Sequence, residues 1–440
     1  MPLSARLGGI SVAMANRNYR LYTYGATPSL LGTWIQRMAV GWYAWHLTQS
    51  GTWLGLVAFV SLAPAVLVAP IAGAFADRVD RLKMVLIIQY ANMLQALALA
   101  VLTLAGVMTI ETLAALSLLQ GILQGLHQPF RQALIGTIVS RSEMTSAIGI
   151  NSTIWNTSRL IGPAISALII LNFGVGITFL VNAFTYLPMI ATLYMLKVPP
   201  TPGTGKSLAD VPAEILEGIK FSASHKFIGP LLLLVFAFSF FGRATAEILP
   251  GYNGAIFGFD ADGLAMLTSA AGLGSLVSGI WLSRRGHLSG LTGILLANIA
   301  FLAIFQVAFS GSDLLFHDPH HFNVTVPLLH LTITASPDLL LGAVAITLWG
   351  FTINACGIIV QSLIQASVPD TIRGRVISLY GLLWLGMPAV GAFVMGASAD
   401  LVGFRWPVAT AAVAIVAAGL WGFARRHRFR TEIEAMASSG

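Results

Sequence analysis

Long apolar stretches, separated by short polar segments, run along almost the whole chain. Twelve of them reach the length of about 20 residues that a helix needs to cross a bilayer. Backbone groups find no hydrogen-bond partners in lipid, so each stretch is predicted to be a helix. The predicted spans are 21–47, 53–76, 83–106, 112–138, 146–170, 174–196, 228–250, 263–283, 288–309, 339–366, 375–399 and 406–424.

The most polar internal segment lies between the sixth and seventh spans and contains four lysines. In each half of the chain, a polar loop precedes a helix in which a glycine comes shortly before a proline. These residues are Gly162-Pro163 in the first half and Gly386 and Pro388 in the second. The similarity between the halves suggests that the chain arose by duplication. Repeated six-helix halves are typical of transporters that rock around a central site. We predict an all-α membrane protein with an N-terminal bundle, a cytoplasmic linker, a C-terminal bundle and a cytoplasmic tail, over residues 1–196, 197–226, 227–424 and 425–440.

Charge is scarce, since only 9% of the 440 residues are charged, against about 25% in soluble proteins. This scarcity excludes a set of soluble domains. The net charge of +7 does not indicate nucleic-acid binding, because the basic residues are scattered between apolar runs. With both termini in the cytoplasm, 20 of the 24 basic residues, Arg131 among them, fall on the inner side and only Arg405 outside. We expect a monomeric, multi-pass protein surrounded by the lipids of a bacterial inner membrane.

Charged residues inside the spans are candidates for function, because a charge in lipid is costly. They are Arg37, Arg159, Arg243 and Glu247. Arg243 and Glu247 are four residues apart and share one helical face, and aligning the two halves places Arg37 opposite Glu247. We hypothesise that these three residues meet in a cavity. Two roles remain open for Glu247, a proton carrier or one partner of a static ion pair.

Other side chains inside the spans are candidates to line a substrate cavity. Arg159 precedes the Gly162-Pro163 bend, where it would either bind an anionic group of a substrate or tether its helix to neighbouring helices. His127 is interpreted as a residue that forms a hydrogen bond near a helix end. The substrate-cavity candidates are Trp34, Gln36, Asn156 and Arg159.

One segment, Gly-Ala-Phe-Ala-Asp-Arg-Val-Asp-Arg-Leu-Lys at 73–83, resembles the loop 2–3 signature of the major facilitator superfamily. Asp80 replaces the second glycine of that signature, as in the branch of drug and siderophore exporters. Segments 29–36, 129–134 and 368–375 resemble the same branch, and 159–163 resembles the span 5 antiporter signature. The motif residues are Gly73, Asp77, Arg78, Asp80, Arg81 and Lys83 in the first signature, and Arg131, Gly162 and Pro163 in spans 4 and 5.

This resemblance implies a mechanism of alternating access, in which two halves expose a central cavity to one side of the membrane at a time. It also implies an inner gate, with Asp77 near the start of span 11 and with Arg78, Arg81 and Lys83 around it. A carboxylate beside a helix N-terminus is favourable, because it meets the positive end of the helix dipole. We expect the basic residues to pair with acidic groups or lipid phosphates.

From these observations we expect a secondary transporter that exports a small organic molecule, such as a drug or a siderophore-like metabolite, in exchange for protons. We expect no cofactor, no bound metal and no enzymatic activity. Two alternatives remain, because fold does not fix function. One is an importer or facilitator with the same fold, and the other is a membrane assembly protein that transports nothing.

Two further segments resemble known motifs in part. The sequence Gly-Thr-Gly-Lys-Ser at 203–207 ends like a phosphate-binding loop, but the first glycine of that motif is replaced by Pro200, which argues against nucleotide binding. The outer loop 310–338 contains His and Asp, which can bind metals, but their spacing matches no fixed site. Apolar and polar residues alternate at 322–326 and 329–334, which predicts a small β-hairpin in that loop. The loop's candidate ligands are His317, Asp318, His320, His321 and His330.

Overall fold

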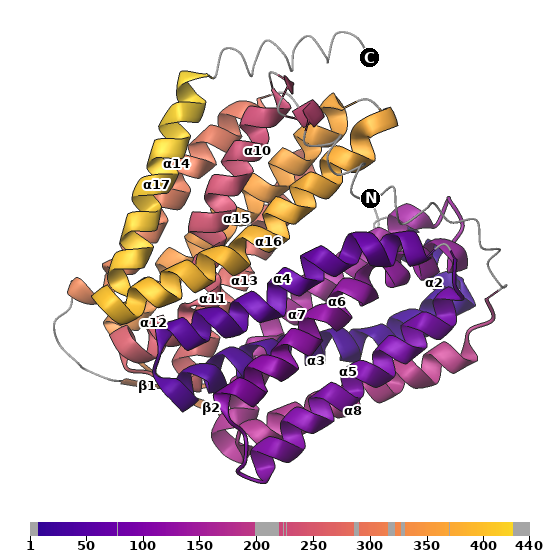
Figure 1. Ribbon diagram of the computed structural model, residues 1–440, viewed down its shortest axis with the longest axis horizontal. Helices are drawn as coiled ribbons and strands as arrows, with labels where there is room; N and C mark the ends of the chain where they lie inside the picture. Colours follow the sequence, from indigo (N-terminus) through magenta and orange to yellow (C-terminus); the bar gives the residue numbers. More distant parts are fainter. Residues whose placement is uncertain are drawn as a thin grey trace. The chain divides into compact units, whose positions relative to one another are not determined.

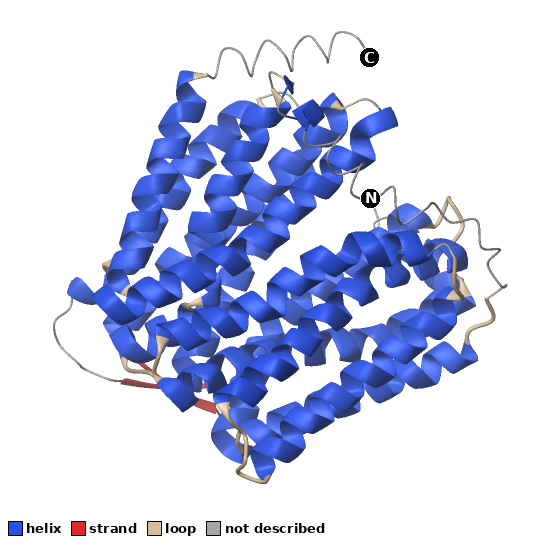
Figure 2. Cartoon of the chain, in the orientation of Figure 1, coloured by secondary structure: helices blue, strands red, loops and turns tan. Residues whose placement is uncertain are grey.

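The computed structural model describes most of the chain, and long helices dominate the described part (Figures 1 and 2). Every structural statement below concerns those residues. They are 8–76, 78–198, 220–222, 224–225, 227–285, 290–315, 322–326, 331–368 and 370–425.

The first half contains a short helix followed by six long ones, and each long helix coincides with one of the first six predicted spans to within a few residues. Two of them begin at polar caps: Asp80 accepts a hydrogen bond from the backbone of Lys83, and Thr109 accepts one from Thr112. The helices are α2 (Gly8–Ala15), α3 (Arg17–Thr48), α4 (Gly51–Ala76), α5 (Arg81–Leu104), α6 (Ile110–Ile138), α7 (Met144–Phe173) and α8 (Val175–Met195).

In the second half, the seventh predicted span is a broken helix, whereas the other five are continuous. The broken helix consists of α10 (Ile228–Ala237), the π-helix η2 (Phe238–Arg243), α11 (Ala244–Glu247), α12 (Leu249–Tyr252) and the π-helix η3 (Asn253–Phe257). The remaining helices are α13 (Ala261–Arg285), α14 (Leu291–Ser310), the 3₁₀ turn η4 (Ser312–Leu314), α15 (Pro337–Ser367), α16 (Asp370–Val402) and α17 (Arg405–Ala424).

Ten of the described helical segments are long and apolar enough to cross a membrane, which confirms a multi-pass helical protein. The other two predicted spans correspond to α3 and α6, which are 32 and 29 residues long. Their length is sufficient for a span, but their sequences contain several glutamines, histidine and arginine. That α3 and α6 also cross the membrane stays a prediction from the sequence.

The predicted hairpin is confirmed. Strands β1 (Phe322–Val326) and β2 (Leu331–Ala335) are antiparallel, with Phe322 opposite Ala335 and Val326 opposite Leu331. The alternating residues form the strands, as the pattern indicates. The five His and Asp residues considered as metal ligands in this loop lie outside the described residues.

Contacts divide the chain into two compact units. Unit 1 comprises Met1–Tyr43 and Pro64–Val211, and unit 2 comprises Ala44–Ala63 and Pro212–Gly440. Helices α3 and α4 therefore each contribute residues to both units.

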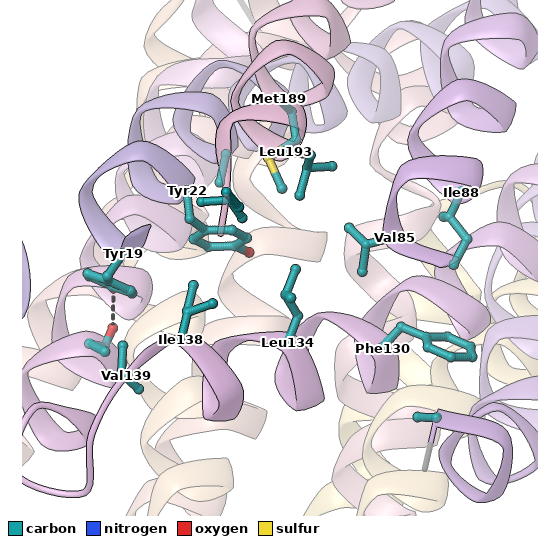
Figure 3. Packing of buried hydrophobic residues seen from close by; sticks show 14 of the residues in the cluster. Tyr19, Tyr22, Val85, Ile88, Phe130, Leu134, Ile138, Val139, Met189 and Leu193 are labelled. Atoms are coloured by element: carbon teal, nitrogen blue, oxygen red, sulfur yellow. Dashed lines mark hydrogen bonds between the residues drawn. The ribbon is translucent and has the colours of Figure 1, made fainter. Parts of the chain in front are cut away.

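The core of unit 1 gathers side chains from α3, α5, α6 and α8 (Figure 3). Tyr22, Phe130 and Met189 are buried there, and the hydroxyl of Tyr19 donates a 2.8 Å hydrogen bond to the carbonyl of Ala147. Glycines let α3 approach α8 closely: a Cβ on Gly32 would lie 2.1 Å from the Thr185 hydroxyl oxygen. Small residues at such crossings are typical of packing between membrane helices.

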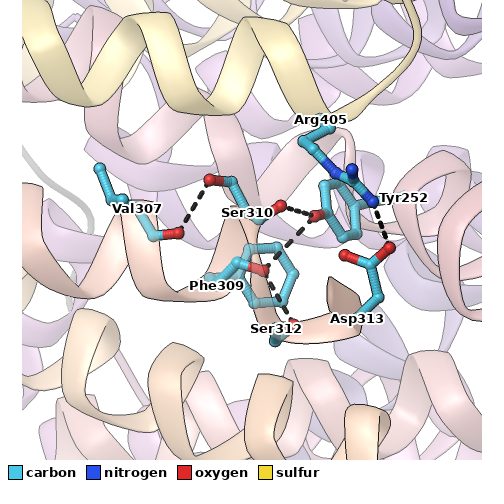
Figure 4. A network of polar contacts seen from close by, with 7 residues as sticks. All are labelled: Tyr252, Val307, Phe309, Ser310, Ser312, Asp313 and Arg405. Atoms are coloured by element: carbon cyan, nitrogen blue, oxygen red, sulfur yellow. Dashed lines mark hydrogen bonds and ion pairs between the residues drawn. The ribbon is translucent and has the colours of Figure 1, made fainter. Parts of the chain in front are cut away.

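In unit 2, polar contacts join the end of α14 to the start of α17 (Figure 4). Arg405, the basic residue that the charge count assigns to the outer side, forms an ion pair with Asp313. Beside it, the hydroxyl of Tyr252 donates to the carbonyl of Ser310 at 3.0 Å. Burial raises the pKa of Tyr252, so its hydroxyl keeps its proton and remains a donor.

Candidate functional site

Residues expected in a cavity meet at the indole of Trp34, in unit 1. The guanidinium carbon of Arg37 lies 5.5 Å from the centre of this ring, and that of Arg159 lies 5.8 Å from it. Trp155 packs edge-on against Trp34, with ring centres 5.6 Å apart. These distances are within the range of about 6 Å for cation–π attraction. The fold thus brings α3 and α7 together and gathers two cations at one aromatic surface.

Gly162 makes this arrangement possible, because α7 lies directly against the backbone of α3. A Cβ on Gly162 would lie 2.6 Å from the Cβ of Trp34, closer than real Cβ atoms approach. Pro163 follows within the same helix, which continues without a break from Met144 to Phe173. The glycine therefore serves close packing between helices at Trp34.

Gln36 occupies a different environment from that expected of a cavity residue. It is 3% exposed, and its amide nitrogen donates to Gln95 at 3.1 Å and to Gln120 at 3.0 Å. Asn182 donates to its amide oxygen at 2.6 Å. This buried network joins α3, α5, α6 and α8, which favours a structural role for Gln36. Asn156 is half-buried, and its amide donates to the Ser152 carbonyl of its own helix.

The motif between α4 and α5 fixes a turn in unit 1. Asp80 caps α5 and lies 3.7 Å from the ammonium of Lys83, with both side chains largely exposed. Arg81 donates to the Ala76 carbonyl at 3.2 Å and to the Thr137 hydroxyl at 2.9 Å, so it ties the end of α4 to α6. Arg78 is exposed and Gly73 lies in α4. Asp77 lies outside the described residues, and the predicted gate stays a prediction.

In unit 2, Arg243 lies on an aromatic surface. Its guanidinium carbon is 3.9 Å from the ring centre of Trp384, which in turn stacks on Tyr380 at 6.0 Å. Glu247 is half-buried and ends α11, one turn after Arg243. Arg37 belongs to unit 1 and Glu247 to unit 2, so the pairing of these two residues stays a prediction.

Arg243 and Glu247 flank an irregular part of the seventh predicted span. The π-helix η2 ends at Arg243, and the helix is interrupted again at Ile248, directly after Glu247. Insertions of π-helix inside longer helices are frequent at functional sites. The irregular segment packs against α16, where a Cβ on Gly391 would lie 2.2 Å from the Phe240 carbonyl oxygen.

Unit 1 also contains a polar cavity. It has about 490 Å³ of empty space, part of which opens to the surroundings, and it is lined by residues of α3, α5, α6, α7 and α8. The aromatic rings of Trp155 and Tyr186 form part of its wall. Its polar side chains include Tyr22, Gln89, Asn92, Gln124, His127 and Arg131.

Several polar atoms in this cavity have no hydrogen-bond partner within the described part of the chain. They are the Tyr22 hydroxyl, Gln89 Oε1 and Arg131 Nε, on side chains that are 3%, 2% and 5% exposed. The amide nitrogen of Gln89 lies 3.3 Å from a ring nitrogen of His127. Arg131 donates to Asn151 at 2.8 Å. Unsatisfied polar atoms in a buried site are costly.

The comparisons with known proteins agree with this architecture. The sequence profile of the major facilitator family described as "Transmembrane secretion effector" matches residues 13–439. The chain belongs to this family. It is therefore a membrane transporter and not an enzyme, and the resemblance seen in its sequence motifs is confirmed.

Relatives within this family group include exporters. The chain is 26% identical to the staphyloferrin A transporter of Staphylococcus aureus, over 85% of this chain and 87% of that protein. It is 22% identical to the enterobactin exporter of Shigella flexneri, over 83% of this chain and 79% of that protein. Among solved structures, it resembles a peptide transporter crystallised with alafosfalin, with a TM-score of 0.71 and 13% sequence identity. The match covers 95% of this chain and 96% of that one. The last likeness shows a shared fold.

Within this family fold, the sequence pattern did not indicate that these residues share a cavity, although it singled out Arg131 and His127 for other reasons. Arg131 was expected among the charges of the inner side, yet it is nearly fully buried. Tyr22 and Gln89 were not singled out. A signal was present, because Gln124, His127 and Arg131 recur at intervals of three and four residues and so mark one polar face of a helix.

Proposed function

We propose that this transporter exports a small organic molecule, of the siderophore or drug type, in exchange for protons. The names of its relatives support export: one is an enterobactin exporter and another is the macrolide efflux protein A of Streptococcus pyogenes. We further propose that it works as a monomer in a bacterial inner membrane, with both termini in the cytoplasm. The distribution of basic residues supports this orientation.

The observation that carries proton coupling is the position of Glu247. It is a half-buried carboxylate at the end of the apolar segment Ile228–Glu247, and it ends a one-turn helix beside a π-helix. A charged group in an apolar segment is costly, which makes this carboxylate a candidate for function. One turn earlier in the chain, Arg243 lies over the ring of Trp384. A carboxylate in an irregular helix, four residues after an arginine, suits a carrier that binds and releases one proton in each transport cycle.

The remaining predicted residues have roles in alternating access. Trp34, Arg37 and Arg159 form a surface on which the substrate or its charge is held, and Gly162 keeps that surface closely packed. Asp77, with Arg78, Asp80, Arg81 and Lys83, forms the inner gate, and the exposed members of this motif contact lipid phosphates. The hydrogen bonds of Arg81 to α4 and α6 support a defined geometry for the gate turn.

A screen for substrates is the first test. Cells that lack the transporter are compared with cells that produce it for their accumulation of staphyloferrin A, enterobactin and a macrolide, the compounds that the relatives' names indicate. Export predicts lower accumulation of at least one compound in the producing cells. Higher accumulation in those cells would identify an importer and contradict the proposed direction.

Replacing the intramembrane carboxylate then tests coupling. We expect Glu247→Gln to reduce proton-driven efflux by about 100-fold or more, because an amide of the same shape cannot carry a proton, while the amount of folded protein stays normal. Glu111→Gln makes the same chemical change at an exposed residue in the first turn of α6 and should leave efflux unchanged. Normal efflux by the Glu247 variant would exclude a coupling role.

A further inference from the structure

The cavity of unit 1 has the composition of an anion-binding site. Arg131 is 5% exposed and contributes a permanent positive charge, whereas none of the described residues that line the cavity is acidic. Among the described residues, its hydrogen-bond partner is the neutral amide of Asn151. A buried guanidinium without a nearby carboxylate is unfavourable, because desolvation of the charge is not offset. A ligand that brings a negative charge would remove this penalty.

The free polar atoms define the kind of anion. The Nε of Arg131 and the hydroxyl of Tyr22 are both enclosed donors without partners in the described structure. A carboxylate has two oxygens that accept hydrogen bonds, and it commonly binds the planar edge of an arginine. The Nε–H of Arg131 and the O–H of Tyr22 supply two such donors from α6 and α3.

The walls of the cavity define the rest of the ligand. Trp155, Tyr186 and Met189 contribute aromatic and apolar surface next to the polar atoms. Part of the empty space opens to the surroundings. A ligand would therefore place its carboxylate beside the polar atoms and its aromatic or apolar group against these walls.

We propose that Arg131 and Tyr22 bind a carboxylate attached to an aromatic or apolar group of the transported molecule. This proposal rests on the proposed function, since it names the class of substrate for the same transporter. It assigns a ligand-binding role to Arg131, a residue that the sequence motif presents only as part of a signature in spans 4 and 5. It also explains why α6 is too polar to qualify as a span by composition.

Binding to the purified full-length protein tests the proposal without requiring transport. The probes are benzoate and benzamide, which have nearly the same shape but differ in charge, and affinity is measured by isothermal titration calorimetry. We expect benzoate to bind at least about tenfold more tightly than benzamide, as one hydrogen bond to a charged group implies. Equal affinities for the two probes would overturn the proposal.

Variants locate the bound carboxylate. Arg131→Gln should remove the preference for benzoate, whereas Arg20→Gln, at an exposed residue of α3, should preserve it. Because Arg131 also bonds to Asn151, its loss affects folding as well, so Tyr22→Phe provides the decisive variant. It removes a hydroxyl that has no partner in the described protein, and it should fold normally and bind benzoate about tenfold more weakly. Unchanged benzoate affinity in Tyr22→Phe would overturn the assignment.

The two proposals fail separately. Absence of a benzoate preference in the wild-type protein would contradict the carboxylate site but would leave the proposal of proton-driven export intact. Specific benzoate binding in a protein that moves no protons would support the site and contradict the proposed coupling.

Discussion

At the scale of single residues, aromatic faces accommodate the arginines of the predicted spans. Arg37 and Arg159 lie over Trp34, and Arg243 lies over Trp384. Cation–π attraction contributes about 2 kcal/mol or more when the cation is desolvated. The sequence identified the three cations correctly as unusual, but it could not pair Arg243 with Trp384, since the two are far apart in the chain and share no local pattern.

Gln36 provides a test of whether a polar residue in a span serves structure or transport. Gln36→Leu would leave the amides of Gln95, Gln120 and Asn182 without their partner in a buried site. We expect a loss of about 2–4 kcal/mol in the free energy of unfolding, since each unsatisfied group costs about 1–3 kcal/mol. The measurement is unfolding of the purified protein in detergent.

The matched control is Asn172→Leu, at an exposed amide whose hydrogen bond in the described structure is to the Leu168 carbonyl of its own helix. Its effect should stay within about 0.5 kcal/mol, as for most surface substitutions. If Gln36→Leu and Asn172→Leu change the free energy of unfolding by the same amount, the four-amide network does not stabilise unit 1.

At the scale of elements, the sequence predicted where the helices lie but not how regular they are. All twelve apolar stretches coincide with helical segments in the described structure, and the hairpin forms where alternation indicated it. The break of the seventh span went unpredicted. A π-helix changes the hydrogen-bond register by one residue, whereas hydropathy averages over about 20 residues and is insensitive to that change.

Helices α4 and α16 meet closely in unit 2. A Cβ on Gly51 would lie 2.4 Å from the Gly396 carbonyl, so glycine is required at this crossing. The carboxylate of Asp400, near the end of α16, accepts hydrogen bonds from Gly51 N at 2.5 Å, from Thr52 N at 2.9 Å and from the Ser50 hydroxyl at 2.7 Å. A distant acidic side chain thus caps the start of α4, where the helix dipole favours negative charge.

We predict that Asp400→Asn weakens the hydrogen bonds that cap α4, while the size of the side chain is preserved. Backbone amides of Gly51 and Thr52 should exchange with deuterium about tenfold faster, because a charge-assisted hydrogen bond is replaced by neutral ones. Hydrogen exchange followed by mass spectrometry measures the change. Asp262→Asn, which alters a carboxylate in the first turn of α13, should leave these two amides unaffected. If these amides are equally protected from exchange in the wild-type protein and in Asp400→Asn, the carboxylate does not stabilise the start of α4.

At the scale of the whole molecule, the scarcity of charge determines the class of protein, and the family match identifies it as a transporter. The sequence also located the motif residues, but not the cavity of unit 1. Counting the basic residues on each side of the membrane treats Arg131 as a marker of orientation. The burial of Arg131 depends instead on five helices that come together only in the fold. Substrate and coupling do not follow from the fold, because one fold supports many functions.

Proton movement in reconstituted vesicles tests the central claim most directly. Purified transporter is placed in vesicles that contain a pH-sensitive dye, and a substrate identified by the accumulation screen is added on one side. Exchange predicts that substrate and protons move in opposite directions, and that Glu247→Gln abolishes the proton signal while Glu111→Gln preserves it. Substrate movement without any accompanying proton flux would contradict the account.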